Sequence, residues 1–268
     1  MSWTIIKKFF FDFKRSLFWY GLTFVLYSLM MVSFFPSLRD QSAKFNELIS
    51  VYPEAITKGF GIDVSTFGTL EGFLAVEYFS IVWLIIMGVI SFSLGASIMA
   101  GEIDKGTSEF TFSLPIKRWK VVISKFVSSV IFQVVINFVI LFSTALGFYA
   151  VDETPKWEGF GALFLAMIFT SFFMLALATF LSVMLNSKSR VYALAGGFLT
   201  ASYFLDIISK LIEKAADLKW FTFIHYYGDA QMILSTGNLE WINLFVLGGI
   251  GLVLVLGSLL LSEKRDLR

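Results

Sequence analysis

Residues 159–187 read GFGALFLAMIFTSFFMLALATFLSVMLNS and contain no charged side chain. A helix that crosses the hydrocarbon core of a bilayer, about 30 Å thick, needs about 20 predominantly apolar residues. Lipid offers no hydrogen-bond partners, so every backbone N–H and C=O in that layer must be satisfied within the helix. The stretch is long enough to meet this demand, and it predicts a membrane-spanning helix.

Similar windows recur along the rest of the chain. Four more are charge-free and long enough to span a bilayer: 16–35, 78–101, 126–151 and 241–262. A sixth, residues 191–205, is too short alone, so we expect its helix to continue through Asp206 to about residue 208. We therefore predict an all-α integral membrane protein with six transmembrane helices and a single domain over residues 1–268.

The composition agrees with burial in lipid. Hydrophobic residues make up 57% of the chain, which has 32 Phe, and its mean hydropathy is +0.79. A formal charge of +1 provides no broad positive field, so we expect no nucleic-acid partner. The absence of Cys and the single His exclude disulfides, thiolate metal sites and a cysteine nucleophile. No catalytic or metal-binding residue is expected.

The first 15 residues interleave charged and apolar side chains. On a helical wheel, one face is apolar and the other is charged. The apolar face holds Trp3, Ile5, Ile6, Phe9, Phe10 and Phe13, and the charged face holds Lys7, Lys8, Asp12, Lys14 and Arg15. This pattern predicts an amphipathic interfacial helix lying on the membrane, with a frayed basic tail as the alternative.

Charge asymmetry predicts the topology. Cytoplasmic segments of membrane proteins retain Lys and Arg. With the N-terminus inside, segments 1–15, 102–125, 186–190 and 263–268 hold 14 of the 21 Lys and Arg but only 6 of the 20 Asp and Glu. We expect both termini to be cytoplasmic in a multi-pass protein of the cell (plasma) membrane.

The second long outer segment, residues 209–240, carries an aromatic run between the fifth and sixth spans. Trp220, Phe221, Phe223 and Tyr227 belong to it. Such a run is too apolar for an open loop. We expect it to be partly re-entrant over about 219–230 or to pack over the bundle.

The segment AGEIDKGTSEFTFSLPIKRWKVVISKF, residues 100–126, lies between the second and third spans. Gly106 breaks a helix, Thr107 or Ser108 can cap a new one, and Pro115 ends it. We expect a short helix held below the membrane. An ordinary solvated inside loop is the alternative.

This segment is similar to the first cytoplasmic loop of ABC type-2 permeases, the membrane subunits of type V ABC exporters. The family pattern is roughly Glu-x-x-x-Gly-Thr-x-Glu, then Leu-Pro-x-x-Arg, then Lys. The matching residues are Glu102, Gly106, Thr107, Glu109, Leu114, Pro115, Arg118 and Lys125. The order of elements along the whole chain resembles the family as well.

The resemblance implies that the loop 102–118 forms a coupling helix that docks into a cytoplasmic ABC ATPase. The ATPase-coupling residues would be Glu102, Gly106, Thr107, Glu109, Leu114, Pro115 and Arg118. The chain has no Gly-rich phosphate loop ending in Gly-Lys-Ser/Thr, so ATP and Mg would bind a separate ATPase, present in two copies. The chain itself would bind no cofactor and be no enzyme. A second permease protomer is expected, as a homodimer.

The resemblance also implies a substrate path between the second and fifth helices of two protomers. There the chain offers Phe79, Trp83, Ile86, Phe198, Ser202 and Phe204. Gln133 and Asn137 lie four residues apart on the third helix, so they share a face that could meet substrate or make an interhelical hydrogen bond. So apolar a lining suits a hydrophobic or amphipathic cargo such as a peptide, an antibiotic or a lipid-like molecule. Interhelical or lipid-facing packing is the alternative for each residue.

Two other classes of protein compete with the exporter permease. An ion-coupled secondary transporter would need acidic residues or broken helices near the bilayer midplane, and usually a sequence repeat. An intramembrane hydrolase would need a nucleophile with a base or a metal site. The sequence offers neither set, so both alternatives rank below the permease.

Overall fold

The computed structural model describes residues 3–39, 69–104, 106 and 117–264. These residues form helices and no strands. Six stretches are long and apolar enough to cross a membrane: Trp3–Ser37, Leu70–Ala96, Arg118–Ala150, Trp157–Met184, Lys188–Leu211 and Trp241–Lys264. The predicted all-α membrane fold is confirmed.

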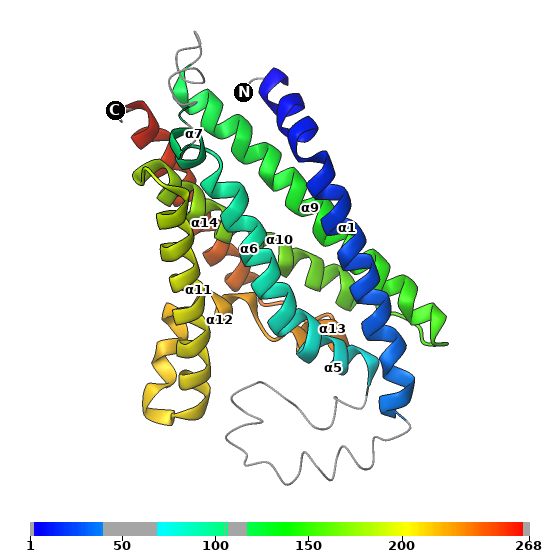
Figure 1. Cartoon of the computed structure of the whole chain (residues 1–268). Coiled ribbons are helices and arrows are strands. Elements are labelled where there is room, and N and C mark those ends of the chain that lie inside the picture. The colour runs from blue at the N-terminus through cyan, green and yellow to red at the C-terminus, as the bar shows by residue number, and fades with distance from the viewer. Residues whose placement is uncertain (1–2, 40–68, 105, 107–116, 265–268) are drawn as a thin grey trace.

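The central helix of the bundle is α10 (Trp157–Met184), which contains the stretch quoted first above. It packs against α6 (Trp83–Ala96), α9 (Arg118–Ala150) and α14 (Trp241–Lys264). Small residues let α6 and α10 approach closely, since a Cβ added to Gly95 of α6 would lie only 2.5 Å from the Cβ of Ala178 of α10. The N-terminal and C-terminal ends of the chain lie at the same end of the bundle, the terminal end, and the opposite end is the far end (Figure 1).

The first helix differs from the prediction of a separate interfacial segment over 1–15 followed by a span over 16–35. The structure has one continuous helix, α1 (Trp3–Arg39). Nothing in the sequence around residue 15 breaks a helix, and α1 packs lengthwise on α9 (Figure 1). Phe9 is buried and stacks on Phe13 at 4.5 Å, so part of the predicted lipid-facing surface contacts protein instead.

The second span begins at Leu70, eight residues before the predicted window. It consists of α5 (Leu70–Leu74), a π-helix η1 (Ala75–Val82) and α6. The hydroxyl of Thr69 caps the start by accepting from the N–H of Gly72 at 3.1 Å. The charge-free window began at residue 78 because Glu77 precedes it. In the structure Glu77 is an exposed residue of η1, and Glu71, near the start of the span, lies 3.6 Å from Lys156, so the helix includes both carboxylates.

The short window 191–205 belongs to α11 (Lys188–Leu211), the fifth span along the chain. This helix continues past Asp206, as predicted. The carboxylate of Asp206 lies 2.8 Å from the ammonium of Lys210, one turn later. This ion pair neutralises the acidic residue inside the helix.

The segment between the fifth and sixth spans folds into the 3-10 helix η2 (Glu213–Phe221) and two short helices, α12 (Phe223–Tyr227) and α13 (Ala230–Thr236). The short helices pack against α10, with α12 also on α14 and α13 on η1, so the predicted packing over the bundle is observed (Figure 1). Contact is close, because a Cβ on Gly159 would lie 2.1 Å from the carbonyl oxygen of Leu234. How deep residues 219–230 lie in a bilayer stays a prediction.

Candidate functional site

The second span ends in a break between α6 and α7 (Ala100–Asp104) at the terminal end (Figure 1). The hydroxyl of Ser182, on α10, accepts from the N–H groups of Met99 at 3.1 Å and Ala100 at 2.9 Å. It also lies 3.2 Å from the carbonyl oxygen of Ala96, to which it can donate. A buried serine of the central helix therefore satisfies the backbone groups that the break leaves without helical partners.

An ion pair fixes α7 to the third span. The ammonium of Lys125 lies 2.7 Å from Oε1 of Glu102 and donates to the carbonyl of Ile98 at 3.2 Å. The two charged side chains are only 15% and 22% exposed. A short charge-assisted bond between largely buried groups holds α7 at a fixed angle to α9.

Two further carboxylates link this junction to the remaining helices. Oδ2 of Asp104 accepts from the N–H of Lys188, at the start of α11, at 2.7 Å. Oε1 of Glu263, near the end of α14, accepts from the N–H of Trp119, at the start of α9, at 3.0 Å. Both carboxylates sit at helix N-termini, where negative charge is stabilised. The residues that flank the loop after α7 are thus anchored to α9, α10, α11 and α14.

The predicted ATPase-coupling residues are placed only in part. Glu102 forms the ion pair above, and Arg118 is half-buried at the first residue of α9. Gly106 has a φ of +66°, a left-handed conformation that favours glycine, which confirms the predicted break. Four more lie outside the described residues: Thr107, Glu109, Leu114 and Pro115.

The amides predicted on one face of the third span make interhelical hydrogen bonds. Oδ1 of Asn137 accepts from the indole N–H of Trp83 at 3.0 Å, and its Nδ2 donates to Ser171 at 3.2 Å. Nε2 of Gln133 donates to the hydroxyl of Ser91 at 2.7 Å. All five side chains are buried, so this polar group joins α6, α9 and α10. Contact of either amide with cargo stays a prediction.

The other predicted path residues do not form one cluster in the single chain. Phe79 and Ser202 are buried, and Ile86 is half-buried. Phe198 and Phe204 of α11 are 37% and 60% exposed. Phe198 stacks on the buried Phe223, with ring centroids 5.8 Å apart, so it still contacts the bundle, whereas Phe204 is mostly exposed.

Sequence reasoning missed Ser182, Asp104 and Glu263. Ser182 lies within a charge-free span, where small polar residues often bond neighbouring helices, and this was its only signal. Glu263 follows the last window directly, but its partner Trp119 is 144 residues away in sequence. Nothing in the local pattern connects the two.

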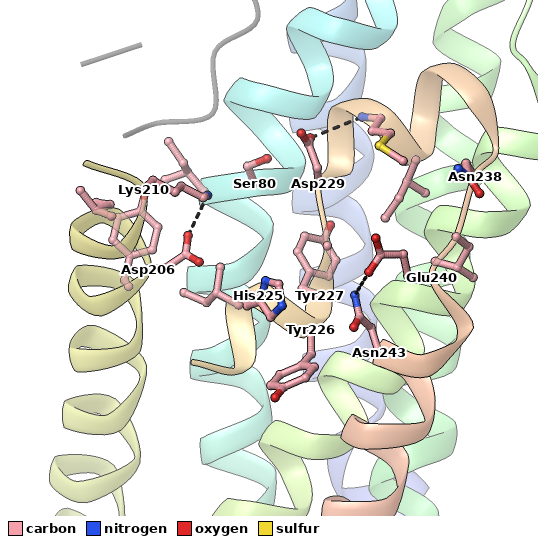
Figure 2. A pocket seen from close by; sticks show the side chains of 18 residues that line it. Ser80, Asp206, Lys210, His225, Tyr226, Tyr227, Asp229, Asn238, Glu240 and Asn243 are labelled. Carbon is pink, nitrogen blue, oxygen red and sulfur yellow. Dashed lines mark hydrogen bonds and ion pairs between the residues drawn. The ribbon is translucent and has the colours of Figure 1, made fainter. Parts of the chain in front are cut away.

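Polar residues also gather at the far end, around a cavity (Figure 2). His225 lies among aromatic side chains, edge-on to Trp220 with ring centroids 4.8 Å apart. Burial, and secondarily the nearby Lys219, lower the pKa of His225 below its ordinary value.

The fold and these junctions define a multi-pass helical membrane protein, and the described residues contain no cluster of His, Cys, Asp and Glu able to hold a metal ion. A family model described as ABC-2 family transporter protein matches residues 3–267, and the chain belongs to that family. No curated protein gives a significant match. The chain is therefore a membrane-spanning transport subunit of a family that generally works with an ABC ATPase.

Proposed function

We propose that this chain is the permease of an ATP-driven exporter and that a separate ATPase drives it through the loop 102–118. The observation that carries the proposal is the set of hydrogen bonds and the ion pair that fix α7 and the start of α9 to the other spans at the terminal end. Both ends of the loop, α7 and the start of α9, are tied to other spans by Glu102, Asp104, Ser182 and Glu263. A force applied to the loop would reach these spans as a rigid-body displacement instead of being lost in a flexible connection.

On this proposal the terminal end is cytoplasmic and the far end faces outward across the cell membrane. The loop carries Lys117 and Arg118 beside the start of α9, as expected for a cytoplasmic segment. The chain supplies no phosphate-binding loop, so ATP and Mg bind the partner, which acts as two copies.

We further propose a homodimer in which α11 faces the second protomer. Large apolar side chains of α11 are exposed at 37% or more: Tyr192, Leu194, Phe198, Phe204, Ile208 and Leu211. Gly196 and Gly197 face open space, which would permit close approach of another helix. A cargo path lined by such side chains suits a hydrophobic or amphipathic substrate.

The test is reconstitution with a co-expressed ABC ATPase from the same source, followed by ATP hydrolysis in proteoliposomes. We expect the two proteins to co-purify and hydrolysis to rise when amphipathic peptides or hydrophobic antibiotics are added. Deleting residues 107–114 should abolish this stimulation while the spans still insert. A matched control is Glu153→Ala, a carboxylate just after α9 at the far end. Unchanged stimulation after the deletion would refute coupling through the loop.

A further inference from the structure

A cavity of about 300 Å³ opens near the far end, within one chain. Four parts of the fold line it: η1, α11, the segment from α12 to α13, and the start of α14. Its volume is at the lower end of the range for small-molecule pockets, about 300–1,000 Å³. Its walls therefore fit a compact organic molecule and not a bulky peptide.

The charged groups of this cavity leave an excess of negative charge. Three carboxylates line it, Asp206, Asp229 and Glu240, against the single ammonium of Lys210. That ammonium is already paired with Asp206, whose residue is only 5% exposed. Lowering of the pKa by burial favours the neutral form of His225, which thus adds no compensating charge near neutral pH. The cavity as a whole favours a cation over an anion.

The carboxylates are spread around the cavity instead of converging on one point. Figure 2 shows Asp206 on one side and Glu240 on the other, with His225 and Tyr227 between them. No group of three His, Cys, Asp or Glu among the described residues is close enough to hold a metal ion. A diffuse negative rim suits an organic ammonium, whose charge is spread over several carbon atoms, better than a metal ion.

The remaining lining is aromatic and aliphatic. Three tyrosines are among the lining residues, Tyr203, Tyr226 and Tyr227, and the aliphatic lining is Ile81, Ile207, Ile224, Met232, Ile233 and Leu239. Aromatic faces attract ammonium groups, and the aliphatic wall would cover an apolar body. We infer that this cavity is a binding site for a small amphipathic organic cation: an ammonium group attached to an aromatic or alkyl body.

A ligand in this cavity would contact residues that connect to the interior of the bundle. Ser80 and Ile81, on its wall, belong to the π-helix η1. Tyr227 donates its hydroxyl to the carbonyl of Phe79 in the same π-helix at 3.4 Å and stacks on Trp83 at 5.1 Å between ring centroids. A bound cation would thus contact the π-helix η1, which leads directly into α6, the helix that carries Trp83 and its hydrogen bond to Asn137.

This inference goes beyond the proposed function, because the site lies within one chain and needs no ATPase. The test is isothermal titration of the purified full-length permease, alone in detergent, with benzyltrimethylammonium. Two matched probes are toluenesulfonate, an anion of similar size, and tert-butylbenzene, a neutral one. We expect the cation alone to bind saturably, with affinity that falls as salt concentration rises.

Variants locate the site on the carboxylates. Asp229→Asn keeps the cap that this side chain provides to the N–H of Gln231, and Glu240→Gln keeps an oxygen that can accept from Asn243. Each substitution should weaken cation binding about threefold to tenfold, and the pair should weaken it further. Glu153→Gln, at the same end but outside the cavity, should leave the affinity unchanged.

Three results would overturn the inference: no saturable binding of the cation at millimolar concentration, equal binding of the three probes, or unchanged affinity in the Asp229→Asn/Glu240→Gln double variant. Because the ATPase is absent from the titration, loss of coupling through the loop 102–118 would not affect the outcome. The two proposals can therefore fail separately.

Discussion

Breaking the ion pair between Glu102 and Lys125 should destabilise the folded protein measurably. The two groups are 2.7 Å apart, and both side chains are mostly buried. Two unit charges 4 Å apart attract by about 4 kcal/mol at an effective dielectric constant of 20, and much of this is offset by desolvation. Removing one partner leaves the other charge partly buried, at a cost of about 2–3 kcal/mol.

The perturbation is a double-mutant cycle of Glu102→Gln, Lys125→Met and both together. Each single variant should lose about 2–3 kcal/mol, because it removes the bond between the two charges while one of them stays partly buried. The double variant should lose about 1–2 kcal/mol less than the sum of the two, because it removes both charges together. Thermal unfolding of the protein in detergent, followed by tryptophan fluorescence, should show Tm lowered by about 4–12 °C in each single variant.

A surface ion pair at the far end provides the control. Arg39 and Glu153 are 3.4 Å apart with side chains 56% and 41% exposed. Glu153→Gln should change stability by less than about 1 kcal/mol, since exposed pairs contribute little. Strictly additive losses in the Glu102 and Lys125 cycle, or a Glu153→Gln loss of equal size, would refute the view that the junction is held by a partly buried charge pair.

Other substitutions test the packing, the helix break and the segment between the fifth and sixth spans. Gly95→Ala should cost about 1–3 kcal/mol of stability, because the new Cβ would lie 2.5 Å from the Cβ of Ala178. Gly196→Ala, whose new Cβ would meet no atom within 4 Å, should be neutral or slightly stabilising. Equal Tm values for the two variants would contradict this expectation. Ser182→Ala should cost about 1–3 kcal/mol by removing the acceptor for two N–H groups of the break, and a Tm unchanged from the parent protein would count against that role. Burial lowers the pKa of His225 below 6.5, so its stabilising contribution is complete above that pH and is lost as pH falls through the folded pKa. Tm should therefore fall more between pH 7.5 and pH 5 in the parent than in His225→Gln. Parallel curves of Tm against pH in the two proteins would contradict this expectation.

The number and order of the spans could be predicted because hydrocarbon thickness sets a length that charge-free windows measure directly. The windows 126–151, 159–187 and 241–262 each lie largely within one long helix, α9, α10 or α14. Helix ends were less predictable, since an ion pair at Glu71 and a hydrogen bond at Trp119 allow polar turns beyond the apolar windows. A charge-free window marks only the part of each helix that lies in the hydrocarbon of the bilayer.

The candidate site was predictable only where its chemistry is local in sequence. Gly106 and Glu102 follow from the loop pattern, and the Asp206 and Lys210 pair follows from i, i+4 spacing. The partnership of Ser182 with Met99 joins residues 83 positions apart. Neither it nor the cavity at the far end has a periodic signal, because both arise only when separate helices pack together.

Coupling through the loop 102–118 is tested most directly by ATP hydrolysis in the reconstituted complex of this permease with its ABC ATPase, compared with the same complex carrying the 107–114 deletion. We expect hydrolysis stimulated by amphipathic cargo in the first complex and none in the second, while the Glu153→Ala control behaves as the parent. Cargo movement by the permease without any ATPase, or equal stimulation in the parent and deletion complexes, would contradict coupling through this loop.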